Sequence, residues 1–301
     1  MTITNKAAVL GNPIAHSLSP VLHNAAYAAL GLDNWHYGRA QVSEGDLAGF
    51  LRNLDDSWRG LSLTMPLKRT IIPFGVPADR WVRLLGVSNT AVFDWSRPNT
   101  QDDRMPAITL HNTDVHGIVD ALTDARDTTA VHSGQTALVI GNGNTARSAV
   151  AAIASMGVRH IDVAARHEAK TAPLIELGER LKVSVASVPL ESVADRAPGH
   201  GFVISTLPAH AADAIADEIA KGNPADAAAP EGLGTLLDVI YDPRPTRLMQ
   251  VWQAKGGVAV GGQEMLLRQA VPQVAFMTGL AVEDVQSRAF DAMRTALYAA
   301  L

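Results

Sequence analysis

The chain has 301 residues, of which 47% are hydrophobic and 18% are charged, and its formal net charge is −5. This composition excludes a disordered chain, the length fits about two domains, and the acidic balance argues against nucleic acid or an anionic membrane as a partner. The absence of cysteine excludes disulfides, thiolate metal ligands and a cysteine nucleophile. Because no signal-like or membrane-spanning apolar run is visible in the sequence, we expect a protein of the reducing cytoplasm.

The first part of the chain is expected to mix strands and helices. Hydrophobic patterning predicts strands at residues 7–10, 36–42 and 60–64, and helices at residues 20–30 and 44–53. The apolar runs 89–93 and 107–111 are predicted to pair as a β-hairpin. A helix is predicted to begin at Asp114.

The following part of the chain alternates apolar strands with helices, which is typical of a parallel sheet covered on both faces. The predicted strands are TALVIG, HIDVAA, VSVASV, FVIST and TLLDVI, beginning at residues 136, 160, 183, 202 and 235. Helices are predicted at 145–156, 169–181 and 209–221, a surface loop at 224–232, and mostly helix from Gly262 onward. We therefore predict an α/β protein: an N-terminal αβ domain of residues 1–113, completed by helices from 262–301, and a Rossmann-like, doubly wound domain of residues 114–261.

A glycine-rich turn lies between the predicted strand TALVIG and the helix that follows it. Gly141, Gly143 and Ala146 form the pattern G-x-G-x-x-A in the strand–turn–helix context of a dinucleotide site. The first glycine allows a tight turn, the second lets the backbone approach a pyrophosphate, and the small third residue packs the helix on the strand. A tight turn with a purely structural role is the alternative interpretation.

The end of the next predicted strand bears on the choice of cofactor. A free ribose 2′-hydroxyl usually meets an Asp or Glu about 20 residues beyond the glycines, whereas this chain has Ala165, Arg166 and His167 there. A guanidinium suits a 2′-phosphate through charge-assisted hydrogen bonds. The sequence therefore favours NADP over NAD, and a solvated surface arginine is the alternative.

Two serines, Ser17 and Ser19, lie in the segment GNPIAHSLSP after the first predicted strand. Their hydroxyls could stabilise the turn itself, or they could bind an anion or a polyol. The histidine pairs His16 with His23 and His111 with His116 lack the i, i+4 spacing of helical zinc ligands, so no metal site is predicted.

Six further segments occur in a fixed order around the glycine loop: GNPIAHSLSPVLHN, GLSLTMPLK, VSNT, HNTDVHG, DVIYDPRPTRL and GQEMLLRQA. Together they resemble the shikimate dehydrogenase family, whose members reduce 3-dehydroshikimate with NADPH. The resemblance covers nearly the whole chain. It implies that the first domain binds the substrate and that the Rossmann-like domain binds NADP.

The resemblance also implies roles for individual residues. Lys68 and Asp114 would be the catalytic pair. Substrate would be held through its carboxylate by Ser17, Ser19 and Tyr241, and through its ring hydroxyls or carboxylate by Thr64, Asn89 and Gln269. The cofactor would be held by Gly141, Asn142, Gly143, Asn144, Thr145, Ala146, Arg166, Ser205, Thr206 and Gly262.

General chemistry agrees with the implied pair, because reduction of a ketone by hydride needs a proton donor near the developing alkoxide. A lysine ammonium can donate that proton and stabilise the oxyanion, although a surface lysine and a helix-capping aspartate are the alternatives. Two other functions remain open from the sequence: oxidation of quinate or shikimate with NAD, and a non-catalytic relative that senses its ligand. We expect a small molecule as the partner, and a homodimer is the assembly considered.

Overall fold

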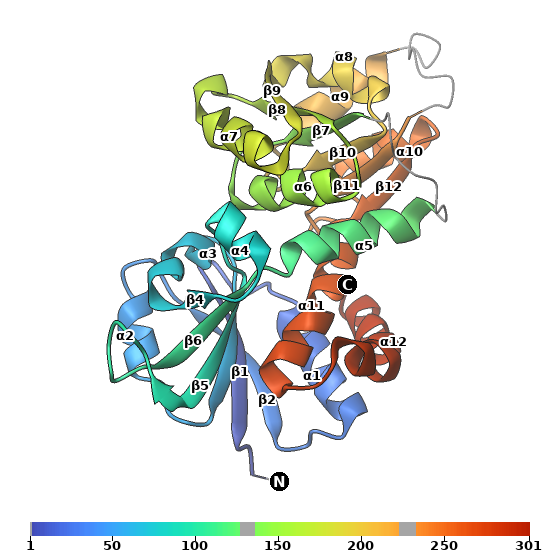
Figure 1. Ribbon diagram of the computed structural model, residues 1–301. Helices are drawn as coiled ribbons and strands as arrows, with labels where there is room; N and C mark the ends of the chain where they lie inside the picture. Colours follow the sequence, from blue (N-terminus) through green and yellow to red (C-terminus); the bar gives the residue numbers. More distant parts are fainter. Residues whose placement is uncertain (1, 127–135, 223–232) are drawn as a thin grey trace. The chain divides into compact units, whose positions relative to one another are not determined.

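The computed structural model describes residues 2–126, 136–222 and 233–301 (Figure 1). By its internal contacts the chain divides into two compact units, one formed by Met1–Asp114 with Leu266–Leu301 and the other by Val115–Met265. The loop predicted at 224–232 lies outside the described residues. Within the described parts, no helix is long and apolar enough to cross a membrane.

The first unit contains a mixed six-stranded sheet with the strand order β2-β1-β3-β5-β6-β4. Strand β1 is parallel to β2 and β3, whereas β5 is antiparallel to both β3 and β6, which confirms the predicted hairpin. The strands are β1 (Asn5–Gly11), β2 (Trp35–Gln41), β3 (Trp58–Leu63), β4 (Val76–Pro77), β5 (Thr90–Pro98) and β6 (Pro106–His111). Because β1, β3 and β6 run in the same direction, their carboxyl ends lie at one edge of the sheet.

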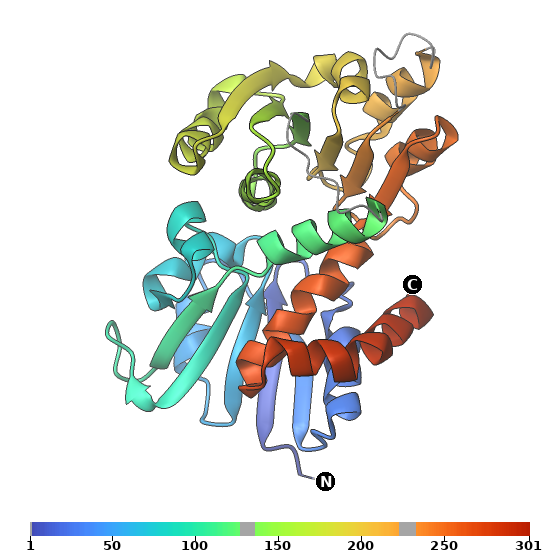
Figure 2. The same ribbon diagram turned by 45° about the vertical axis from the view of Figure 1, so that its right-hand side comes forward.

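Helices cover both faces of this sheet. They are α1 (Ser19–Leu30), α2 (Leu47–Arg52), α3 (Leu67–Thr70), α4 (Arg80–Leu85), the short 3₁₀ helix Ile72–Phe74, and the C-terminal α11 (Gly262–Thr278) and α12 (Val282–Ala300). Figures 1 and 2 show α1, α11 and α12 together on one side of the sheet.

Side chains alternate between the two faces along each strand. On β3, Leu61 and Leu63 join the hydrophobic cluster that includes Leu47 of α2. The intervening residues face α11: a Cβ atom at Gly60 would lie 2.8 Å from the side chain of Met277, so only glycine fits there. Ser62 lies on this same face, where a polar side chain needs a partner from α11.

The second unit contains a fully parallel six-stranded sheet with the order β12-β11-β10-β7-β8-β9. The strands are β7 (Thr136–Ile140), β8 (His160–Ala165), β9 (Ser184–Pro189), β10 (Phe202–Ser205), β11 (Thr235–Asp238) and β12 (Val258–Gly261). Read in chain order, the sheet runs 3-2-1-4-5-6, the arrangement of a doubly wound nucleotide-binding fold. The order reverses between β7 and β10, where such folds bind their ligands.

The remaining helices are α5 (Asp114–Arg126), α6 (Asn144–Ser155), α7 (Ala172–Leu181), α8 (Val193–Arg196), α9 (Asp213–Lys221) and α10 (Arg247–Ala254), with short 3₁₀ helices at Glu168–Thr171, Leu190–Ser192 and Ala197–Gly199. Three predicted helices begin later than expected, and one of them, expected from residue 44, begins at Leu47. The helix expected from residue 209 begins at Asp213, because His210 adopts a left-handed conformation with φ of 65°. The helix expected from residue 169 begins at Ala172, with Pro173 in its first turn.

Candidate active site

The serine loop follows β1 and packs against the end of β3. A Cβ atom at Gly11 would lie 2.5 Å from the methyl group of Thr64, so the close approach of the two segments requires glycine. The backbone N–H of Asn12 donates to the carbonyl of Met65 at 2.9 Å. These contacts bring the serine loop beside Thr64, at the edge where β1 and β3 end.

Within this loop Ser17 and Ser19 are both buried. The backbone N–H of Ser17 donates to the carbonyl of Ile14, and the N–H of Ser19 donates to the Ser17 hydroxyl at 3.4 Å, so part of the predicted turn chemistry is present. Pro20 lies in the first turn of α1. The loop is therefore an ordered turn whose two hydroxyls come from positions separated by one residue, Leu18.

His23 supports the serine loop from α1. Its Nδ1 lies 2.9 Å from the carbonyl oxygen of Ser19, so Nδ1–H is the donor, and its ring stacks on Tyr37 with centroids 3.8 Å apart. Complete burial lowers the pKa of His23 to about 4, although the hydrogen bond to Ser19 opposes the shift. The imidazole is therefore neutral at physiological pH and positions the loop.

Lys68 and Asp114 form a buried ion pair. Lys68 lies on α3 after β3, and Asp114 begins α5 after β6, so the parallel directions of β3 and β6 bring the two residues to the same edge. Lys68 Nζ donates to Asp114 Oδ2 at 2.5 Å, and the side chains are 11% and 1% exposed. Both charged groups are therefore largely shielded from water, and Lys68 is the more exposed of the two residues.

Asn89 connects this pair to helix α11. Its Nδ2 lies 2.9 Å from Asp114 Oδ1, 2.9 Å from Thr113 Oγ1 and 2.8 Å from Gln269 Oε1. Its Oδ1 accepts from the backbone N–H of Thr113 at 2.8 Å, and this unambiguous donor fixes the orientation of the amide. An N–H of Asn89 therefore faces the carboxylate of Asp114.

The structure thus joins Lys68, Asn89, Asp114 and Gln269 by hydrogen bonds, with the serine loop beside Thr64 at the same sheet edge. Tyr241 belongs to the second unit, where it follows β11 and is half-buried, so its part in substrate binding stays a prediction. Sequence reasoning missed several buried polar residues behind Asn89, among them Gln273. Its spacing of one helical turn from Gln269 was the available signal.

In the second unit the glycine loop lies at the reversal point of the sheet, between β7 and α6. Gly141 has φ of 114°, and a Cβ atom there would lie 2.3 Å from Thr206 Oγ1, so glycine is required for both reasons. Gly143 is the N-cap of α6, and among the described residues no atom beyond its neighbours in the chain lies within 4 Å of its Cβ position, whereas Ala146 is fully buried. The open backbone at the N-terminus of α6 suits an anionic group.

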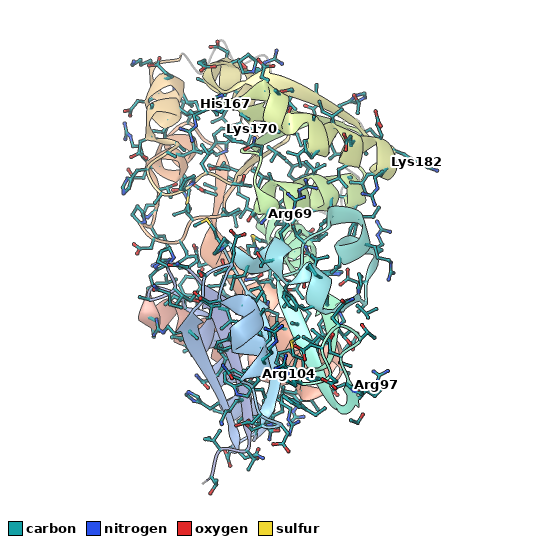
Figure 3. All side chains as sticks on the ribbon, turned by 90° about the vertical axis from the view of Figure 1, so that its left-hand side faces the viewer. Arg69, Arg97, Arg104, His167, Lys170 and Lys182 are labelled. Atoms are coloured by element: carbon teal, nitrogen blue, oxygen red, sulfur yellow. The ribbon has the colours of Figure 1, made fainter. Side chains whose placement is uncertain are left out.

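The segment after β8 carries exposed basic side chains. Arg166, His167 and Lys170 are all exposed, and Figure 3 shows His167 and Lys170 in the same part of the second unit. By contrast, Gly262 is explained by packing, because a Cβ atom there would lie 2.0 Å from the carbonyl oxygen of Val239. Ser205 is buried at the end of β10. The cofactor roles of Gly262 and Ser205 stay predictions.

Residues 2–126, 136–222 and 233–301 contain no group of three or more histidine, aspartate or glutamate side chains that could hold a metal ion.

Comparison with known proteins shows the family to which the chain belongs. The family model described as the shikimate dehydrogenase substrate binding domain matches residues 9–91, which include the serine loop, Lys68 and Asn89. A curated NADP-dependent shikimate dehydrogenase from Trichormus variabilis is 31% identical over 306 residues, covering 98% of this chain and 96% of the relative. The chain belongs to the shikimate dehydrogenase family.

Solved structures of the family confirm the α/β fold class. The shikimate dehydrogenase of Mycobacterium tuberculosis is 35% identical with a TM-score of 0.80, over 98% of this chain and 99% of that chain. The Thermus thermophilus shikimate 5-dehydrogenase, solved in complex with NADP(H) and shikimate, is 26% identical with a TM-score of 0.76, over 99% of this chain and 100% of that chain.

Proposed function

We propose that this member of the shikimate dehydrogenase family interconverts 3-dehydroshikimate and shikimate with NADP as cofactor. The relative from Trichormus variabilis is named for that activity, and the Thermus thermophilus relative binds NADP(H) and shikimate. The observation that carries the proposal is the buried pair of Lys68 and Asp114, joined through Asn89 to Gln269 at one sheet edge. A ligand-sensing relative would not need to retain this pair.

The second unit holds the cofactor in this proposal. The open backbone at Gly143 and the N-terminus of α6 fit the pyrophosphate. Arg166 binds the 2′-phosphate, and the exposed position of its side chain after β8 supports this role. NADPH, when bound, supplies the hydride.

The first unit holds the substrate. The hydroxyls of Ser17 and Ser19 donate to the carboxylate, since one ordered loop carries both residues two positions apart. Thr64, Asn89 and Gln269 contact the ring hydroxyls or the carboxylate. A neutral clamp of hydroxyl donors suits an acid that also carries several alcohol groups.

Lys68 performs the proton transfer. In the reducing direction, the carbonyl carbon gains hydride and the carbonyl oxygen gains the proton that the Lys68 ammonium donates, which yields the alcohol. Asp114 holds the ammonium in place, because its Oδ2 accepts a hydrogen bond from Lys68 Nζ. In the oxidising direction, neutral Lys68 accepts the proton from the alcohol.

Initial rates with shikimate and quinate, each with NADP and NAD, test the proposal. We expect the highest kcat/KM with shikimate and NADP. A preference for quinate with NAD, or no turnover with any combination, would contradict it. A homodimer, a cytoplasmic location and the assignment of one binding role to each unit stay predictions of the sequence.

A further inference from the structure

A chain of buried side-chain hydrogen bonds extends behind the candidate active site. Tyr37 Oη donates to Ser62 Oγ at 2.6 Å, and Ser62 Oγ donates to Gln273 Oε1 at 2.9 Å. Gln273 Nε2 donates to Thr90 Oγ1 at 3.0 Å, and Thr90 Oγ1 donates to Asn89 Oδ1 at 3.0 Å. The chain thus ends on the residue that contacts Asp114.

Each hydrogen bond in this chain has a defined donor and a defined acceptor. Gln273 Nε2 also lies 3.4 Å from the backbone carbonyl oxygen of Asn89, which can only accept a hydrogen bond. The amide NH₂ group of Gln273 therefore faces Asn89, and its amide oxygen faces Ser62. Ser62 must then donate to Gln273 and accept from Tyr37. No member can reverse without placing two donors or two acceptors in contact.

The sheet and helix α11 together create this arrangement. Ser62 on β3 and Thr90 on β5 are directly paired in the antiparallel register, so their side chains are neighbours on the face toward α11. Gln273 reaches both of them from α11, one turn beyond Gln269. All of these side chains except Gln269 are buried, so water cannot replace a lost partner.

We propose that Gln273 is a positioning residue for the reaction, and this inference rests on the proposed function. Gln273 holds Thr90 and the backbone of Asn89, and Asn89 holds the carboxylate oxygen of Asp114 that Lys68 does not use. Loss of the Gln273 amide frees Thr90 to rotate, so Asn89 loses one of the two donors that orient its amide. The ammonium of Lys68 then loses its fixed direction toward the substrate oxygen.

The first test replaces the amide by an apolar side chain of similar length, Gln273→Met. We expect kcat with shikimate and NADP to fall about 10- to 100-fold, because a displacement of about 1 Å at an acid–base group has effects of that order. The dissociation constant of NADP should stay within about twofold, because the residues proposed to bind it lie in the second unit. Tyr37→Phe is the matched control: Ser62 can still donate to Gln273, so kcat should change less than about threefold.

The second test is a rescue by pH with Gln273→Glu. A neutral carboxyl group can accept from Ser62 and donate toward Asn89 or Thr90, as the amide does, whereas an ionised one can only accept. Burial favours the neutral form. We therefore expect the kcat of Q273E, relative to wild type, to rise about tenfold as the pH falls from about 8 to about 6, while Q273M shows no such recovery.

The outcomes separate this inference from the proposed function. If wild type turns over shikimate but Q273M keeps kcat within threefold, the inference is wrong and the proposed function stands. If Q273M does not fold, the pH dependence of Q273E decides, and a constant ratio to wild type would show that Gln273 only packs. If wild type has no activity with shikimate, the proposed function itself fails.

Discussion

The Asp114→Asn variant is the sharpest probe of the buried ion pair. Asp114 Oδ2 accepts from Lys68 Nζ at 2.5 Å, and its Oδ1 accepts from Asn89 Nδ2 at 2.9 Å. The amide of the new asparagine has only one oxygen, so its NH₂ group must face either the ammonium of Lys68 or the amide NH₂ group of Asn89. The substitution therefore places two donors in contact in either orientation.

The size of the effect follows from burial. The side chains of Lys68 and Asp114 are only 11% and 1% exposed, so water replaces little of the lost interaction. Removing one partner of a buried pair costs about 3–5 kcal/mol, and the residual exposure of Lys68 favours the lower end of that range. We expect the free energy of unfolding to fall by about 3 kcal/mol. Turnover with shikimate and NADP should fall by about 10²- to 10⁴-fold, as for the loss of a positioned acid–base pair.

Urea unfolding followed by tryptophan fluorescence measures the first quantity, and the absorbance of the reduced cofactor measures the second. Asp94→Asn is the control, because Asp94 pairs with Arg97 at 2.7 Å with side chains that are 37% and 70% exposed. This variant should keep the stability and the turnover of wild type, because an exposed ion pair contributes little to stability. An Asp114→Asn protein that matches wild type in stability and turnover would refute the reasoning.

Four further variants test other parts of the account. Arg166→Ala should raise the KM for NADP about tenfold or more and leave the KM for NAD unchanged, as one charge-assisted contact to the 2′-phosphate is lost; equal effects on both cofactors would place Arg166 elsewhere. Burial lowers the pKa of His23 to about 4. Between about pH 6.5 and about pH 4 the unfolded chain therefore binds a proton at this residue that the folded chain does not bind. The free energy of unfolding should fall by up to about 3 kcal/mol as the pH falls through this range. His23→Phe should remove that part of the pH dependence in urea unfolding, and identical pH slopes for variant and wild type would exclude it. Gly141→Ala should destabilise the fold, because φ is 114° and Thr206 Oγ1 lies 2.3 Å from the added Cβ. Gly143→Ala should keep wild-type stability and weaken NADP binding. Equal thermal unfolding midpoints for the two variants would contradict this reasoning.

Features encoded in contiguous residues could be predicted from the sequence. The strand, glycine turn and helix around Gly141 lie within one short segment, and the predicted elements there match β7 and α6 closely. The hairpin of β5 and β6 was also predicted, because each strand is long enough to show its apolar pattern. Strand β4 has only two residues, Val76–Pro77, which is too short to carry any period, and it was missed.

The candidate site was only partly accessible to sequence reasoning. The ordered motifs indicated Lys68 and Asp114, and the structure places their charged atoms in contact. The hydrogen bond between Ser62 and Gln273 joins residues that are 211 positions apart in the sequence. It depends on the register of β3 with β5 and on how α11 packs against the sheet. No local pattern encodes such a contact: the one-turn spacing from Gln269 could draw attention to Gln273, but its hydrogen-bond partners could be identified only in the folded chain.

The most direct test of the central claim compares wild type with Lys68→Ala in two measurements on the same preparations. The first is the initial rate of shikimate oxidation with NADP, and the second is the dissociation constant of shikimate by calorimetry. The account predicts that turnover falls by several orders of magnitude in Lys68→Ala while shikimate binding changes far less, because the serine loop still holds the carboxylate. Unchanged turnover in Lys68→Ala would contradict the assignment of proton transfer to Lys68.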